Sequence, residues 1–176
     1  MEWWDLYDKN KKKTNRTHIR GNPLPEGYYH IVVHVWIRNT KGEILLTKRH
    51  PDKTYPNLWE CTGGSILAGE ESLEGALREV EGEIGIILDE SNGNLVKSER
   101  RESNFCDIWV FNQSFELSKT MLQQDEVIDI KWVTRTELDQ IYHSKNLVPT
   151  LSYYKELFYT GIESGVANDH QKSRNE

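Results

Sequence analysis

The feature that most constrains this chain is a helical pattern from Ser72 to Ile84, which follows two adjacent glycines, Gly63 and Gly64. Side chains three and four positions apart share one face of a helix, so a repeat at that spacing predicts a face that packs against a core. We predict Ser72 as the N-cap of this helix and Gly85 as its stop. The apolar residues at this spacing are Leu73, Ala76, Leu77, Val80 and Ile84.

A second face of the same helix carries acids. Glu79 and Glu83 lie four positions apart, so their side chains point the same way, about one turn apart. Two carboxylates in this arrangement repel each other unless a cation lies between them, and hard cations such as Mg2+ or Mn2+ take oxygen ligands of this kind. Glu70, in the loop before the helix, reaches the same end of the site, and Arg78 is expected to orient the acids through a charge-assisted pair. The residues therefore predict a divalent metal site.

A solvated acidic face is the alternative interpretation of this helix. For a lone pair of glutamates four positions apart, that interpretation is the more common one. Here the pair also stands at fixed offsets from a diglycine, a loop glutamate and an arginine, and this favours the metal site. The acids concerned are Glu70, Glu71, Glu74, Glu79, Glu81 and Glu83.

The whole stretch from Gly64 to Ile86 resembles the Nudix box, which is a glycine, five residues, Glu, seven residues, then Arg-Glu-aliphatic-any-Glu-Glu-any-Gly-aliphatic. The match covers 23 consecutive positions and keeps every fixed residue except one. The resemblance implies an α+β Nudix fold, in which a mixed β-sheet is sandwiched between helices (α/β/α). It also implies that Glu79 and Glu83 bind the metal, that Arg78 orients them and that the Gly64 carbonyl faces the metal.

One position departs from the box, because Gly82 stands where the family has the first glutamate of its Glu-Glu pair. Glu81 cannot replace that carboxylate, since at ~100° per residue it points about 200° away from Glu79. We expect weaker metal binding or slower turnover unless a carboxylate from outside the box compensates. Glu126 is the candidate, because it precedes a late strand where Nudix enzymes often place a metal ligand or catalytic base. The alternative is a loop acid that serves solubility.

The remaining pattern predicts an N-terminal hairpin, a mixed set of strands and two further helices. We expect the hairpin and its connection at residues 1–27, the Nudix domain at 28–162, and a disordered tail at 163–176. The extended piece at 59–62 should end at the diglycine. The other expected strands are 30–37, 43–49, 94–101, 105–116 and 127–133, and the other expected helices are 136–143 and 150–160.

Composition excludes several classes of function. The 176 residues carry a net charge of −6, which argues against broad binding of nucleic-acid polymers, because such binding needs a basic face. No apolar run approaches the ~20 residues that span a bilayer, and the first residues do not resemble a signal peptide. Cys61 and Cys106 have neither metal-type spacing nor a disulfide framework. A cytoplasmic protein is therefore expected.

The predicted reaction is metal-assisted hydrolysis of a diphosphate linkage in a small molecule, such as a nucleoside diphosphate derivative. Arg49 and Lys48, at a strand end, are candidates to bind phosphate, although a solvated strand end is the alternative, especially for Lys48. Aromatic residues are candidates to stack on a ring of the substrate, with a place in the core as the alternative. The aromatic candidates are Trp36, Tyr55, Phe105 and Trp109, of which we favour Trp36. Exposed apolar residues of the hairpin suggest a homodimer.

Two rival functions remain. The segments Trp4-Asp5-Leu6-Tyr7-Asp8 and Tyr29-His30 look like the isopentenyl-diphosphate isomerase branch of the Nudix superfamily. The carry-over of that chemistry fails at three positions, because the catalytic cysteine is Gly63 here, a histidine ligand is Ser65 and a glutamate ligand is Asn104. The other rival is a ligand-binding module that has lost catalysis through Gly82. We favour the hydrolase.

Overall fold

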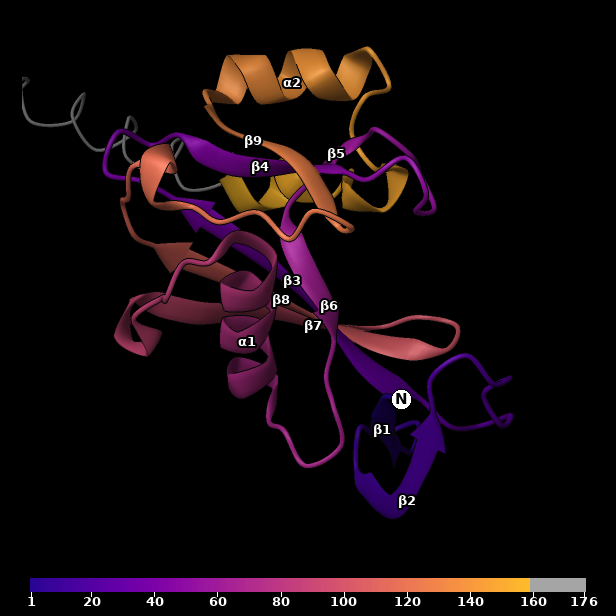
Figure 1. The fold of residues 1–176 in the computed structure, drawn as a ribbon. Coiled ribbons are helices and arrows are strands. Elements are labelled where there is room, and N and C mark those ends of the chain that lie inside the picture. The colour runs from indigo at the N-terminus through magenta and orange to yellow at the C-terminus, as the bar shows by residue number, and fades with distance from the viewer. Residues whose placement is uncertain (159–176) are drawn as a thin grey trace, which may run out of the picture.

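Strand β3, His30–Arg38, forms the centre of the fold because it is apolar on both faces. The computed structural model describes residues 1–158 (Figure 1). β3 pairs in parallel with β8, Asn104–Asn112, and antiparallel with β4, Ile44–Arg49, and β6, Thr62–Ser65. The sheet is completed by β5 (Trp59–Glu60) and β9 (Val127–Val133), which pair with β4, and by β7 (Gly93–Arg100), which pairs with β8.

Alternation along β3 creates two cores, one on each face of the sheet. Toward helix α1, Ser72–Ile84, the core contains Ile31, Val33, Val35 and Ile37 together with Ala76, Val80 and Ile84. Toward helix α2, Arg135–His143, the core contains Trp36, Cys106 and Ile108 together with Leu138 and Tyr154. The two helices therefore lie on opposite faces of a mixed sheet (Figure 1), which confirms the predicted α+β, α/β/α architecture. Among residues 1–158, no helix has the length and apolar character needed to cross a membrane.

The N-terminal hairpin is confirmed, and residues 8–12 connect its two strands. It pairs β1, Trp3–Tyr7, with β2, Lys13–Ile19, in antiparallel register. The ammonium of Lys11 in the turn lies 2.6 Å from a carboxylate oxygen of Asp107, a residue of β8 that is fully buried. The hairpin is therefore fixed to the sheet by an ion pair. The predicted limits of hairpin and domain stay predictions.

Helix α1 has the predicted length but a different N-cap. Glu71, not Ser72, is the N-cap residue, and it forms a capping box with Glu74. The hydroxyl of Ser72 instead accepts a hydrogen bond from the indole N–H of Trp109 at 2.9 Å, so the side chain serves packing against β8. Gly85 ends the helix in the left-handed conformation, with φ 71°, as predicted.

Two further predictions differ from the structure. The diglycine does not end the strand but lies inside β6, where a Cβ atom on Gly63 would lie 2.2 Å from the Val33 carbonyl oxygen. The helix predicted at 150–160 is divided, because Pro149–Leu151 forms the 3-10 turn η3 and the chain becomes helical again at residues 154–158. Its last two predicted residues and the predicted tail lie outside the described residues. Two other 3-10 turns are η1, Glu90–Asn92, and η2, Leu117–Lys119.

Candidate active site

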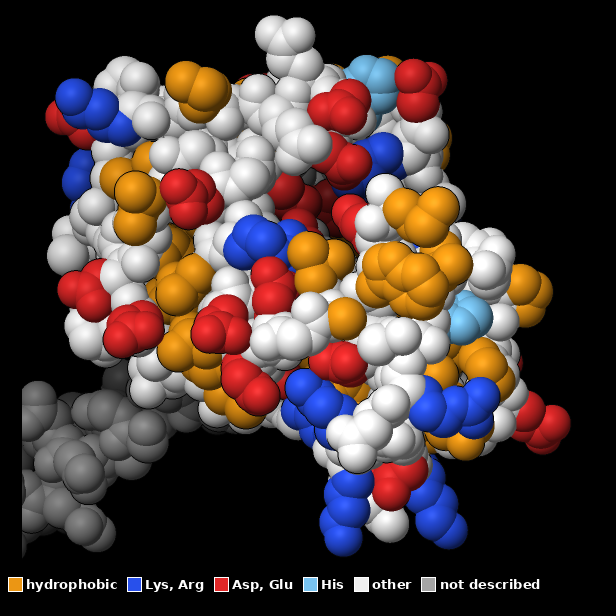
Figure 2. Space-filling view, turned by 60° about the horizontal axis from the view of Figure 1, so that its bottom comes forward, with side chains coloured by type: hydrophobic (Ala, Val, Ile, Leu, Met, Phe, Trp, Pro, Cys, Tyr) orange, Lys and Arg blue, Asp and Glu red, His pale blue; other side chains and the backbone are white. Residues whose placement is uncertain are grey.

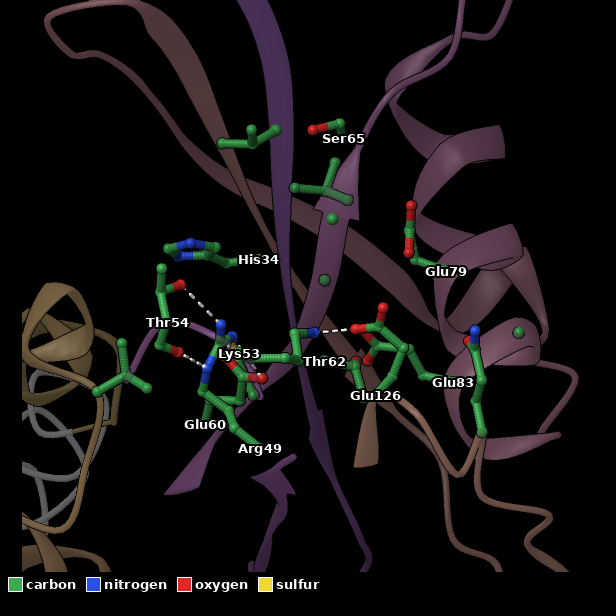
Figure 3. Close-up of a pocket in the computed structure, with 18 of the residues that line it drawn as sticks. His34, Arg49, Lys53, Thr54, Glu60, Thr62, Ser65, Glu79, Glu83 and Glu126 are labelled. Carbon is green, nitrogen blue, oxygen red and sulfur yellow. Dashed lines mark hydrogen bonds and ion pairs between the residues drawn. The ribbon is translucent and has the colours of Figure 1, made fainter. Parts of the chain in front are cut away.

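A cavity of about 550 Å³ opens beside α1 and β6, and five glutamates line it, namely Glu2 and the four that Figure 3 labels. Glu79 and Glu83 come from α1, Glu60 from β5, and Glu126 from the segment before β9. In the space-filling view, acidic side chains lie in a hollow with Lys and Arg side chains near its edge (Figure 2). The cavity therefore combines a carboxylate cluster with cationic groups around it.

Hydrogen bonds from the Arg78 guanidinium fix helix α1 relative to the loop before it and to strand β6. Its Nε donates to Glu70 at 2.5 Å, its Nη1 donates to Glu79 at 2.8 Å, and its Nη2 donates to the Ser65 carbonyl at 3.0 Å. These bonds join the loop before the helix, the helix itself and strand β6. The position of the Glu79 carboxylate is thus set by Arg78, as the sequence predicts.

Glu83 is the most deeply buried acid of the cavity, with 7% of its surface exposed. Burial is the main cause that raises its pKa well above the ordinary value, and the neighbouring carboxylates of Glu60 and Glu79 raise it further. Burial likewise raises the pKa of Glu60 and of Glu79. Among residues 1–158, no side chain makes a hydrogen bond or salt bridge to the Glu83 carboxylate. A bound cation would relieve this concentration of negative charge.

Glu126 and Glu60 are each paired with a side-chain cation. Glu126 is in contact with the ammonium of Lys53, and Glu60 accepts from Nη1 of Arg49 with both oxygens, at 3.0 and 2.8 Å. Lys53 also lowers the pKa of Glu60 and Glu83, so its charge acts on all three acids. Arg49 donates in addition to the Thr54 carbonyl at 2.6 Å, which ties strand β4 to the loop at residues 50–58.

The comparisons with known proteins agree with this geometry. A family model described as NUDIX domain matches residues 28–154. An uncharacterized Nudix hydrolase of Listeria innocua is 42% identical over 151 residues, which cover 85% of this chain and 89% of the relative. The chain belongs to the Nudix family. Its relatives are named hydrolases, and it is accordingly a Nudix-type pyrophosphohydrolase; enzymes of this family generally use divalent metal ions.

Two solved structures show the same fold. The DR0079 protein of Deinococcus radiodurans superposes with a TM-score of 0.72 at 19% identity, covering 90% of this chain and 99% of that chain. The NUDIX domain of Shewanella oneidensis NrtR, solved in complex with ADP ribose, superposes with a TM-score of 0.53 at 19% identity, covering 68% of this chain and 82% of that domain. At these identities the likeness concerns the fold.

The Nudix box of this chain is therefore the segment that forms one wall of the cavity. Glu79, Glu83, Gly64 and Arg78 line the cavity together with Gly82, the position that departs from the family pattern. The carboxylate of Glu79 packs so closely on Gly64 that an added Cβ would lie 2.4 Å from its carboxyl carbon. At Gly82, by contrast, an added Cβ would meet nothing within 4 Å. The space for the missing acid remains.

Three site predictions do not agree with the geometry. Glu70 is not among the cavity-lining residues, because Arg78 and the Leu67 amide take its oxygens, so it positions Arg78 rather than a metal. Trp36 is 0% exposed in the core beside α2 and cannot contact a substrate. Lys48 lies outside the cavity with its ammonium over the Trp59 ring at 5.7 Å, because strand alternation turns it away from its neighbour Arg49.

Sequence reasoning also missed residues that face the cavity. Glu60 and Lys53 were not singled out, because a two-residue strand and an irregular loop have no periodicity that shows where a side chain points.

His34 of β3 also lines the cavity, and its Nδ1 lies 2.7 Å from the Tyr153 hydroxyl. Burial lowers the pKa of His34 to about 3, so its imidazole is neutral. The hydroxyl of Tyr153 also accepts from Trp36 Nε1, so it can donate its own proton to His34.

The donor set of the cavity fits a hard divalent cation by its chemistry. Carboxylate oxygens of Glu79, Glu83 and Glu126, together with the Gly64 carbonyl, are the ligands that such ions prefer. No group of three His, Cys, Asp or Glu within residues 1–158 is already arranged to hold a metal ion. Arg78 pairs with Glu79 and Lys53 pairs with Glu126, so a metal at these carboxylates would share them with two side-chain cations.

Proposed function

We propose that this chain hydrolyses the diphosphate linkage of a nucleoside diphosphate derivative with the help of Mg2+ or Mn2+. The observation that carries the proposal is the presence of Glu79, Glu83 and Glu126 in the lining of one cavity together with Gly64. A bound divalent ion supplies charge neutralisation of the diphosphate and a lowered pKa of its water ligand. The ADP ribose bound by the NrtR domain is an example of the substrate class.

The residues of the chain have distinct proposed roles. Glu79 and Glu83 hold the cation from α1, and the Gly64 carbonyl faces it from β6. Arg78 is a positioning residue, because it acts on Glu79 through a hydrogen bond. Glu126 is the candidate proton acceptor, and Arg49 the candidate phosphate contact at the cavity wall.

Purified protein incubated with a panel of nucleoside diphosphate derivatives tests this proposal. We expect Mn2+- or Mg2+-dependent release of a nucleoside monophosphate or of phosphate, and loss of at least about 100-fold in kcat when Glu83→Gln removes the charge. Glu81→Gln is the matched control, since Glu81 is an exposed acid of the same helix. A chain that binds nucleotides without cleaving any of them would instead be a binding module.

Assembly and location stay proposals as well. We propose a homodimer through the hairpin, where Trp3 of β1 is 44% exposed, and sizing by light scattering with wild type and Trp3→Ser tests it. A monomer at micromolar concentration would contradict the dimer. The free, buried thiols of Cys61 and Cys106 agree with the proposed cytoplasmic location.

A further inference from the structure

Tyr55 is an exposed aromatic residue on the wall of the cavity. Its side chain is 45% exposed, whereas Trp36, Phe105 and Trp109 are between 0% and 9% exposed in the two cores. Among residues 1–158, Tyr55 is the one exposed large hydrophobic residue that also lines the cavity. An exposed aromatic ring leaves its apolar face in water, and a ligand that covers this face would remove that contact with water.

Tyr55 has a strained backbone conformation. Its φ is 53°, in the left-handed region that a side chain of this size rarely occupies, and Asn57 in the same loop has φ 61°. Strained residues of this kind persist where the surrounding structure determines them, and they cluster at ligand-binding sites.

A chain of polar contacts from the cavity wall determines the position. Glu60 holds the guanidinium of Arg49, and Arg49 in turn holds both the carbonyl and the hydroxyl of Thr54, at 2.6 and 3.1 Å. Thr54 immediately precedes Tyr55, and the Tyr55 carbonyl accepts from the Leu58 amide at 3.4 Å. These hydrogen bonds fix the backbone on both sides of Tyr55 relative to the Glu60 carboxylate, and Figure 3 shows Arg49 between Glu60 and Thr54.

The cavity has room for more than a diphosphate. Its volume of about 550 Å³ lies in the range of sites that enclose a whole small molecule, roughly 300–1,000 Å³. Its wall includes apolar groups, Val148 and Leu151, in addition to the carboxylates and cations. We propose that Tyr55 stacks on the planar ring of the substrate and thereby selects nucleobase-bearing diphosphates over ring-free diphosphates. This inference rests on the proposed hydrolase function.

The test compares Tyr55→Ala and Tyr55→Phe with wild type on two substrates, ADP ribose and an alkyl diphosphate without a ring. Tyr55→Ala should raise KM for ADP ribose about ten-fold with kcat within about two-fold, and leave KM for the alkyl diphosphate unchanged, since base stacking on an aromatic side chain is worth a factor of this size. Tyr55→Phe should restore KM, because it keeps the ring. Tyr28→Ala is the matched control, a tyrosine outside the cavity whose hydroxyl is bound by Arg16.

A second measurement separates this inference from the proposed reaction. Saturation-transfer NMR with AMP detects contact between the protein and the base without any turnover, and its signal should fall in Tyr55→Ala but persist in Tyr55→Phe. An equal AMP signal in wild type and Tyr55→Ala, or an equal change of KM on both substrates, would overturn the stacking role. If no diphosphate is cleaved, the proposed function fails, while the AMP signal still decides the role of the ring.

Discussion

The carboxylate of Glu79 lies directly against the Cα of Gly64, so that a Cβ atom added there would lie 2.4 Å from the carboxyl carbon and 2.5 Å from both oxygens. Strand β6 and helix α1 can approach this closely because residue 64 has no side chain. The first glycine of the Nudix box is therefore required by the packing of an acid against the backbone. Gly64 and Glu79 both line the cavity, so this contact lies in its wall.

Replacement of Gly64 should disable the site while the fold persists. Gly64→Ala should force the Glu79 side chain away from β6 and from Arg78, and lower kcat/KM by roughly 100-fold, since displacement of a catalytic group by about 1 Å costs this much. Activity assays and thermal unfolding together check the result. A variant with near wild-type activity would show that the Glu79 carboxylate need not occupy this position.

Restoration of the missing acid should strengthen metal binding. A Cβ at Gly82 meets nothing within 4 Å, and the position lines the cavity, so Gly82→Glu can be accommodated without a clash. We expect a roughly ten-fold lower Kd for Mn2+ by calorimetry, which corresponds to about 1.4 kcal/mol. Gly82→Gln is the control, because it has the same size without the charge. Equal affinities for Gly82→Glu and Gly82→Gln would contradict the role assigned to this helix face.

Glu83 should destabilise the metal-free protein as pH rises. Its folded-state pKa is raised above the ordinary value of 4.5, so between that value and the folded-state pKa the folded chain binds more protons than the unfolded chain. The free energy of unfolding consequently falls as pH rises through this window. Glu83→Gln removes the contribution and should raise Tm in EDTA at about pH 8 by several degrees, since about 1 kcal/mol corresponds to roughly 2–4 °C. Glu81→Gln should not, and a lower Tm for Glu83→Gln at that pH would refute the argument.

Lys53 should compete with the divalent ion. Its ammonium contacts Glu126 and attracts the charges of Glu60 and Glu83, so it acts as a counter-charge inside the cavity. Lys53→Met should lower the Kd for Mn2+ about three- to ten-fold in calorimetry, because the acids lose their internal cation. Lys48→Met removes the same charge outside the cavity and should leave the Kd unchanged. Weaker binding in Lys53→Met would mean that the lysine assists the metal instead.

The hairpin should depend on Lys11 for its attachment. Asp107 is fully buried, and its Oδ1 accepts from both Lys11 and Ser98 at 2.6 Å, so loss of the ammonium leaves a buried charge without its partner. We expect Lys11→Met to lower the free energy of unfolding by about 2 kcal/mol. Lys12 is exposed, so Lys12→Met should leave the free energy of unfolding unchanged. Addition of Asp107→Asn to Lys11→Met should recover part of the loss, because the buried charge is removed. Chemical denaturation curves measure all three, and an unchanged midpoint for Lys11→Met would show that the ion pair contributes nothing.

Local patterns were sufficient to predict the helix at 72–84, the strands and the pair of acids on one helix face. These follow from the spacing of side chains along a regular element, and neither the period of a helix nor that of a strand needs a partner to be recognised. The glycine at 85 is likewise a local signal, because the end of a helix depends on the backbone conformation of a few neighbouring residues. The N-cap of this helix is not a purely local choice. Ser72 and Glu71 are both suitable N-caps, and the hydrogen bond to Ser72 from Trp109, 37 residues away, leaves the cap to Glu71.

What the sequence determined by itself is the identity of the box, its missing acid at Gly82 and the class of reaction, because all of these are carried by residues on one short segment. Only the tertiary structure decided which other residues share the cavity. Glu60, Lys53 and Tyr55 come from a short strand and a loop, whereas Trp36, Lys48 and Glu70, which looked suitable in the sequence, turn into the core, away from the cavity or toward Arg78. The physical reason is that the direction of a side chain in a short or irregular segment is fixed by long-range contacts, here the bonds of Arg49 to Glu60 and Thr54.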